Sequence, residues 1–87
     1  MLEEFLGQKV VVDLKSTYVC IGKLTKHDEL YLEMRNADLH DLRDTDTTRE
    51  IYTADSKATG IKRNRKRLLL LRADVVAVAL LDDVVDA

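Results

Sequence analysis

A dense basic run lies in the second half of the chain, where five of the seven residues from 61 to 67 are positively charged. These cations are Lys62, Arg63, Arg65, Lys66 and Arg67. Such a cluster can bind the phosphates of a nucleic acid in a salt-dependent way. Two other roles stay open, because the cations can keep the apolar stretch after them soluble or can meet acidic side chains on a neighbouring subunit. The chain has a formal net charge of −2, so nucleic-acid binding has to come from this local clustering.

The residue types of metal sites and acid–base catalysis are present, but their spacing is poor. His27 stands beside Asp28 and Glu29 in a predicted turn, where consecutive side chains point apart. The acidic residues between 38 and 55 lack the glycine and the final glutamate of a calcium loop. The sequence has no phosphate-binding glycine motif and no nucleophile elbow. We therefore expect a binding or scaffolding module without metal or cofactor, and an enzyme that uses His27 is the weakest alternative.

The length and composition indicate a small intracellular protein. A chain of 87 residues makes one domain and buries only roughly 60 to 65% of its unfolded surface, so domains of this size often gain stability by oligomerising. The acidic N-terminus does not resemble a secretory signal, and the apolar stretch 68–81 is too short to cross a bilayer. We therefore expect a cytoplasmic location. The one cysteine, Cys20, excludes an intrachain disulfide and is expected to be a small buried apolar residue.

Alternating apolar residues predict five short strands that form a small antiparallel sheet. In the first, Val10, Val12 and Leu14 alternate with polar residues, and Val11 is the exception. The second is apolar on both faces, and Gly22 favours a sharp bend there. The predicted strands are 9–14, 18–24, 30–35, 68–71 and 75–78. A helical turn over 2–6 that ends at Gly7 precedes them. An all-β chain of this size is a small barrel or a strongly curved sheet.

The middle of the chain, residues 36–60, has the weakest pattern. It mixes acidic residues and threonines with one apolar pair, Ile51 and Tyr52. We expect the third strand to fray into a long loop, with a short strand near Ile51. A helical turn after Thr53 would end at Gly60, a residue type that often terminates helices.

Two groups of residues resemble the two sequence motifs of the Sm and Sm-like proteins, which include bacterial Hfq. The first motif is matched in spacing by Gly7, Val10, Val12, Leu14, Gly22, Leu24 and Asp28, and the second by LLLLRADVVAV from residue 68 to 78. The resemblance covers roughly residues 2–35 and 67–79. It implies that residues 1–87 form a single Sm-like domain, a bent five-stranded barrel, and that the chain is a divergent member of bacterial or phage type.

Three positions depart from the family pattern. Thr17 and Ala73 replace glycines, and Tyr31 stands where many members have an asparagine that holds a nucleobase. Tyr31 alternates away from its apolar neighbours and should leave the core, where its ring can stack on a base for about 1 to 3 kcal/mol. A phenol lacks the paired donor and acceptor of an amide, so selective recognition of uridine is not expected.

The resemblance also implies a shared binding site and a ring. Arg72 would approach Tyr31 from another strand so that the two side chains sandwich a base, while Asp74 accepts a hydrogen bond from the base edge. Alternatively, Arg72 and Asp74 simply pair within their turn. The fourth and fifth strands, near 68–71 and 75–78, carry more aliphatic surface than a small barrel covers, and open edges leave backbone groups unpaired. A ring of five to seven copies joined through these strands follows from the resemblance.

Two functions remain open at this point. The first is a homo-oligomeric ring that binds RNA or another single-stranded nucleic acid through Tyr31, Arg72 and Asp74, with the basic run as an auxiliary contact to the phosphates. The second is a structural or protein-interaction ring without nucleotide recognition. The first is the predicted function, and the acidic balance of the chain and the tyrosine at position 31 allow the second as an alternative.

Overall fold

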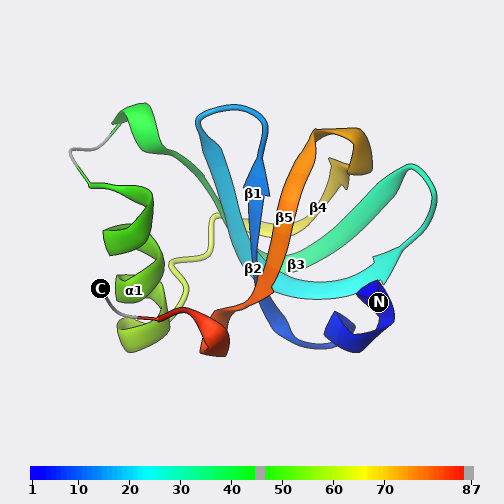
Figure 1. Cartoon of the computed structure of the whole chain (residues 1–87), viewed down its shortest axis with the longest axis horizontal. Helices are drawn as coiled ribbons and strands as arrows, with labels where there is room; N and C mark the ends of the chain where they lie inside the picture. The colour runs from blue at the N-terminus through cyan, green and yellow to red at the C-terminus, as the bar shows by residue number, and fades with distance from the viewer. Residues whose placement is uncertain (45–46, 86–87) are drawn as a thin grey trace.

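Five antiparallel strands form one strongly bent sheet in the computed structural model, which describes residues 1–44 and 47–85 (Figure 1). After a 3-10 turn over Leu2–Phe5, the strands are β1 (Lys9–Leu14), β2 (Tyr18–His27), β3 (Tyr31–Asp41), β4 (Arg65–Leu71) and β5 (Val75–Leu80). Their order in the sheet is β4-β3-β2-β1-β5, so β4 and β5 are the two edges. The predicted fold class, a bent five-stranded antiparallel sheet after an N-terminal helical turn, is confirmed. No helix within the described ranges is long and apolar enough to span a bilayer.

The bend of the sheet lies where β2 and β3 approach each other most closely. A Cβ atom on Gly22 would lie 2.6 Å from the Cβ atom and 2.9 Å from the Cα atom of Ala37 on β3. The pairing of the two strands shifts register at this point, between Ile21 and Lys23, and again shortly after it, between Leu24 and Lys26. Register shifts of this kind increase the local twist and bend of a strand. Glycine at position 22 therefore allows the close contact that the curvature requires.

Apolar side chains cover one face of the sheet and the β1–β2 part of the other. One cluster contains Val10, Val12, Cys20 and Leu32, and the 3-10 turn at the N-terminus packs against it. The opposite face of β1 and β2 forms a second cluster around Val11, Val19 and Ile21. This second cluster explains why β2 is apolar on both sides and why Val11 breaks the alternation of β1. Burial also raises the pKa of the Cys20 thiol to about 12.

The second cluster is covered by a helix, α1 (Arg49–Thr59), and by the 3-10 turn Leu81–Asp83. The prediction of a short strand near Ile51 is therefore wrong, and most of the segment expected as a loop is β3 or α1. Thr48 caps the helix by accepting a hydrogen bond from the Ile51 backbone N–H at 3.2 Å. Gly60 ends it with a φ angle of 98°, as the sequence predicts.

Polar contacts hold α1 and the start of β4 against β3. The Tyr52 hydroxyl on α1 donates to the Asp38 carboxylate, and its ring stacks on His40 with 4.4 Å between centroids. Burial, followed by this hydrogen bond, raises the pKa of Tyr52. The Asn64 side-chain amide bonds to both the N–H and the C=O of Leu39 at 3.0 Å, as a paired strand would. Asn64 thereby fixes the chain to β3 immediately before β4 begins.

Candidate nucleic-acid interface

The turn between β2 and β3 is organised by Asp28. Its Oδ1 atom accepts hydrogen bonds from the backbone N–H groups of Leu30 at 2.8 Å and Tyr31 at 2.7 Å. These two bonds, with Tyr31 making the larger contribution, lower the pKa of the Asp28 carboxyl. The Asp28 N–H also donates to the Tyr31 carbonyl at 3.0 Å. The side chain of Asp28 therefore holds the turn that presents Tyr31.

The turn between β4 and β5 lies against the Asp28 turn. The Arg72 backbone N–H donates to the Leu30 carbonyl at 2.8 Å, and its guanidinium Nη1 donates to the Asp28 carbonyl at 2.7 Å. Tyr31 on β3 lies opposite Leu71 on β4. Residues more than 40 positions apart in sequence are thus adjacent in the structure. The guanidinium of Arg72 stabilises the Asp28 turn from a neighbouring strand.

The side chains of the three residues predicted to share a site line different pockets. Tyr31, whose exposed fraction is 38%, lines a pocket of about 370 Å³ together with Lys26, Arg67 and Leu69. Arg72 lines a groove beside the N-terminal turn and β5. Asp74 faces a third pocket, and its backbone carbonyl accepts from the N–H of residue 15 at 2.9 Å. Among the described residues no ion pair joins Arg72 to Asp74.

A buried carboxylate positions Arg67 in the Tyr31 pocket. Only 5% of Glu33 is exposed, and it accepts hydrogen bonds from the Thr25 hydroxyl at 2.7 Å and the Arg35 Nε at 3.1 Å. The Arg67 guanidinium binds the other oxygen of Glu33 through Nε at 3.1 Å and Nη2 at 3.0 Å. The hydroxyl and the two guanidinium groups, in that order, lower the pKa of Glu33 to about 2. Arg67 is therefore fixed next to Tyr31 while half of its side chain stays exposed to solvent.

The lowered pKa of Glu33 predicts a pH-dependent contribution to stability. A carboxyl with a folded pKa near 2 and an ordinary value of 4.5 stabilises the fold fully above pH 4.5, and this contribution disappears as the pH falls towards 2. We expect wild type to be more stable than Glu33→Gln at pH 7 and the difference in unfolding free energy to shrink between pH 4.5 and pH 2. Urea denaturation of both proteins, from pH 7 down to pH 2, measures this difference in unfolding free energy. A difference that is constant with pH would contradict the assigned contacts of Glu33.

The remaining cations of the basic run do not line the Tyr31 pocket with Arg67. Lys62 and Arg63 precede β4, and Lys62 lines a polar pocket under α1. Arg65 lines the same pocket as Asp74, and its Nη1 donates to the Asn64 carbonyl at 2.9 Å. Lys66 is exposed on β4. The cations that were predicted as auxiliary contacts to phosphate are thus spread around the start of β4.

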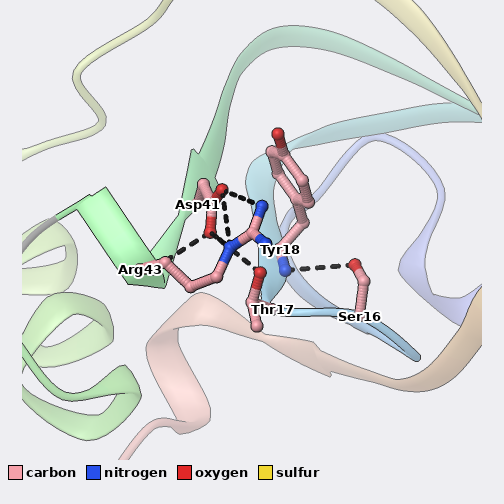
Figure 2. A network of polar contacts seen from close by, with 5 residues as sticks. All are labelled: Ser16, Thr17, Tyr18, Asp41 and Arg43. Carbon is pink, nitrogen blue, oxygen red and sulfur yellow. Dashed lines mark hydrogen bonds and ion pairs between the residues drawn. The ribbon is translucent and has the colours of Figure 1, made fainter.

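A second polar network joins the start of β2 to the end of β3, at the strand ends far from the Asp28 turn (Figure 2). Asp41 accepts from the Thr17 hydroxyl at 2.8 Å and from the Arg43 backbone N–H, Nε and Nη2. The bonds from Arg43, followed by the one from Thr17, lower the pKa of Asp41. Thr17 stands where the family has a glycine, and here its hydroxyl ties the β1–β2 turn to the end of β3. Sequence reasoning missed this network, and the only local signal for it is the spacing of Asp41 and Arg43.

The residues considered for catalysis have other contacts. The His27 Nε2 atom lies 3.9 Å from a carboxylate oxygen of Glu3 on the N-terminal turn, while Asp28 is occupied by its own turn. Within residues 1–44 and 47–85, no group of three or more His, Cys, Asp or Glu side chains is placed to share a metal ion.

Both edges of the sheet are open and carry exposed aliphatic side chains. On β4, Leu69 is 46% and Leu71 is 50% exposed, and on β5 Val76 is 64% exposed. A pocket of about 510 Å³ lined by Leu69, Leu71 and Asp74 lies beside the β4 edge, which does not pair with β5 of its own chain. Open, apolar strand edges are a template for pairing with another chain.

Comparisons with known proteins identify the fold. No family model matches the sequence, and no curated protein matches it either. A solved Sm protein of Pyrococcus abyssi in complex with a uridine heptamer is 16% identical, with a TM-score of 0.62 over 91% of this chain and 90% of that one. A solved Sm-like protein of Archaeoglobus fulgidus is 18% identical, with a TM-score of 0.62 over 92% of this chain and 88% of that one. These likenesses agree with the two motifs in the sequence, and the chain has the fold of the Sm and Sm-like proteins.

Proposed function

We propose that copies of this chain assemble into a ring through β4 and β5 and that the ring binds single-stranded nucleic acid, RNA above all, at Tyr31. The observation that carries the proposal is the pair of open apolar edges on one small sheet. An edge of one copy that pairs with the different edge of the next makes a head-to-tail contact, which closes into a ring or continues as a fibre. Pairing would satisfy the free backbone groups of both edges and cover Leu69, Leu71 and Val76.

The Tyr31 pocket has the chemistry of a nucleotide site. It offers a partly exposed aromatic ring for stacking, an apolar wall from Leu69, and two cations, Lys26 and Arg67, for phosphate. Arg67 is already oriented by Glu33, which reduces the conformational entropy lost on binding. The uridine heptamer bound by the Pyrococcus abyssi Sm protein, which has the same fold, supports single-stranded RNA as the ligand.

The turn after β4 would take the next part of the ligand. Arg72 and Asp74 follow Leu71, the residue that lies opposite Tyr31. A strand that leaves the Tyr31 pocket in this direction would meet Arg72 as a cation and Asp74 as an acceptor for a base edge. Because Arg72 also donates to the Asp28 carbonyl, its loss would in addition loosen the turn that presents Tyr31. An auxiliary contact to phosphate stays a prediction for the other cations, which are Lys62, Arg63, Arg65 and Lys66.

Titration of fluorescent oligo-U and oligo-A at two salt concentrations tests the ligand. We expect saturable, salt-sensitive binding to both, with little preference, because the phenol of Tyr31 does not read the uridine edge. Tyr31→Ala should weaken binding about 5-fold to 150-fold, the equivalent of about 1 to 3 kcal/mol of stacking. Tyr31→Phe keeps the ring and is the matched control, and Arg67→Ala and Arg72→Ala should each weaken binding and reduce its dependence on salt.

Two outcomes would contradict this assignment. If Tyr31→Ala binds the oligonucleotides as tightly as wild type, the ligand binds at another surface. A ring of the expected mass that binds neither oligonucleotide would favour the alternative function, a structural or protein-interaction ring. Tyr31 stands at the position where many Sm proteins have an asparagine, and this difference is the observation that supports the alternative.

A further inference from the structure

Unpaired charges of opposite sign stand at one end of each edge strand. Arg63 and Lys66, at the start of β4, are exposed and form no ion pair within the described part of the chain. Asp82 and Asp83 lie in the 3-10 turn after β5, with Leu81 between them and the strand. Both are exposed, and they likewise form no ion pair among residues 1–44 and 47–85. Each copy therefore carries unpaired cations beside one open edge and unpaired acids beside the other.

Antiparallel pairing of the two edges would bring the unpaired cations beside the unpaired acids. β4 is basic at its start and apolar from Leu68 to Leu71, whereas β5 is apolar along its length and is followed by the acids. If a neighbour's β5 ran antiparallel to β4, the two apolar segments would face each other and the acids would arrive at the basic start of β4. In a parallel arrangement, the cations would lie beside Asp74 and Val75, and the acids would reach Arg72, whose guanidinium already donates to the Asp28 carbonyl.

We infer that the basic residues at the start of β4 bind Asp82 and Asp83 of the next copy in an antiparallel β4–β5 interface. This inference rests on the proposed ring and adds the charged groups that meet across the interface and a role for the basic run. The ion pairs fix the direction and the register of two aliphatic strands that would otherwise slide against each other. Complementary charges of this kind also raise the association rate and exclude wrong partners.

The distribution of charge favours this role over a nucleic-acid contact for the same residues. The run is dispersed around the start of β4, and of its five cations only Arg67 lines the Tyr31 pocket. No exposed aromatic side chain lies among residues 61–67 to stack a base.

Charge reversal on each edge, measured by light scattering, tests the inference. Arg63→Glu/Lys66→Glu and Asp82→Lys/Asp83→Lys should each lower the mass in solution at physiological salt, because like charges would then meet across the interface. The two variants should assemble with each other when mixed, and a chain that carries all four substitutions should regain the wild-type mass. Glu29→Lys reverses an exposed acid in the β2–β3 turn, at the strand ends opposite the start of β4 and the end of β5, and should leave the mass unchanged.

The outcomes separate this inference from the proposed function. A monomeric wild type would contradict the ring itself. A ring whose mass is indifferent to both reversals, or one in which Arg63→Glu/Lys66→Glu abolishes oligonucleotide binding without a change of mass, would overturn only the inference. Circular dichroism establishes that each variant folds. If a reversal does not fold, the neutral variants Arg63→Gln/Lys66→Gln and Asp82→Asn/Asp83→Asn should still dissociate at a lower salt concentration than wild type.

Discussion

The Leu69→Pro variant is expected to be a folded monomer. Backbone N–H groups on a strand point alternately to its two sides, and the Arg72 N–H is directed at β3. The N–H of Leu69 is therefore directed at the open side of β4, where proline removes no bond within the subunit. It does remove a donor that a neighbouring strand needs, and its ring obstructs the approach of that strand. Light scattering should give the mass of one chain, with a circular dichroism spectrum like that of wild type.

Leu70→Pro is the matched control for this variant. The N–H of Leu70 is directed at β3, and the side chain is buried in the core, so proline at this position should unfold the subunit. The pair of variants separates loss of assembly from loss of fold. A Leu69→Pro protein with the same mass as wild type would show that the β4 edge does not join the copies.

The Gly22→Ala variant is expected to lose about 3 kcal/mol of unfolding free energy. The added methyl group would lie 2.6 Å from the Ala37 Cβ atom and 2.9 Å from its Cα atom, so the backbones of β2 and β3 have to separate. Overpacking a core typically costs about 1 to 3 kcal/mol, and displacement of backbone places this case at the upper end. Urea denaturation at a fixed protein concentration measures the loss, because assembly makes stability depend on concentration.

Gly7→Ala provides the comparison for Gly22→Ala. Gly7 has a φ angle of 79° but no atom within 4 Å of an added methyl group, so only backbone strain of about 1 to 2 kcal/mol opposes the substitution. Gly22→Ala should therefore be the more destabilising of the two. Equal losses would mean that β2 and β3 can separate freely at the bend.

The alternation of apolar residues predicted the sheet because each strand buries at least one face. Val10, Val12 and Leu14 occupy one side of β1, as expected for a half-buried strand. The exception at Val11 and the two-sided apolar pattern of β2 were signs of a second cluster, but they do not reveal what covers it. The extension of β3 to Asp41 was missed because polar residues, Asp38, His40 and Asp41, interrupt its end, and the two aspartates are satisfied by contacts distant in sequence.

The first half of α1 escaped prediction because the buried side of the helix is largely polar, whereas the helical turn expected after Thr53 is its second half. Tyr52, Thr53 and Ser56 face the sheet, so the usual apolar stripe of an amphipathic helix is absent. The adjacent pair Ile51 and Tyr52 instead imitated a short strand. The local signal for the helix came from its two capping residues, Thr48 and Gly60. The prediction used Gly60 and overlooked Thr48.

The candidate site was predicted in part. The resemblance to Sm proteins placed the Arg72 turn beside the turn of Tyr31, and the structure shows the two turns hydrogen-bonded. It did not reveal that Tyr31, Arg72 and Asp74 line separate pockets. The contact between Glu33 and Arg67 was invisible because it joins residues 34 positions apart across two strands, and alternation fixes only the face on which each side chain lies.

The mass of the wild-type protein in dilute solution tests the central claim, that other copies cover the open edges β4 and β5. Light scattering should give five to seven times the chain mass of 9.9 kDa, and the same multiple should persist on dilution at low salt. A particle of 9.9 kDa at every concentration, with β4 and β5 amides protected from hydrogen exchange, would contradict the account, because the edges would then be sheltered without a second copy.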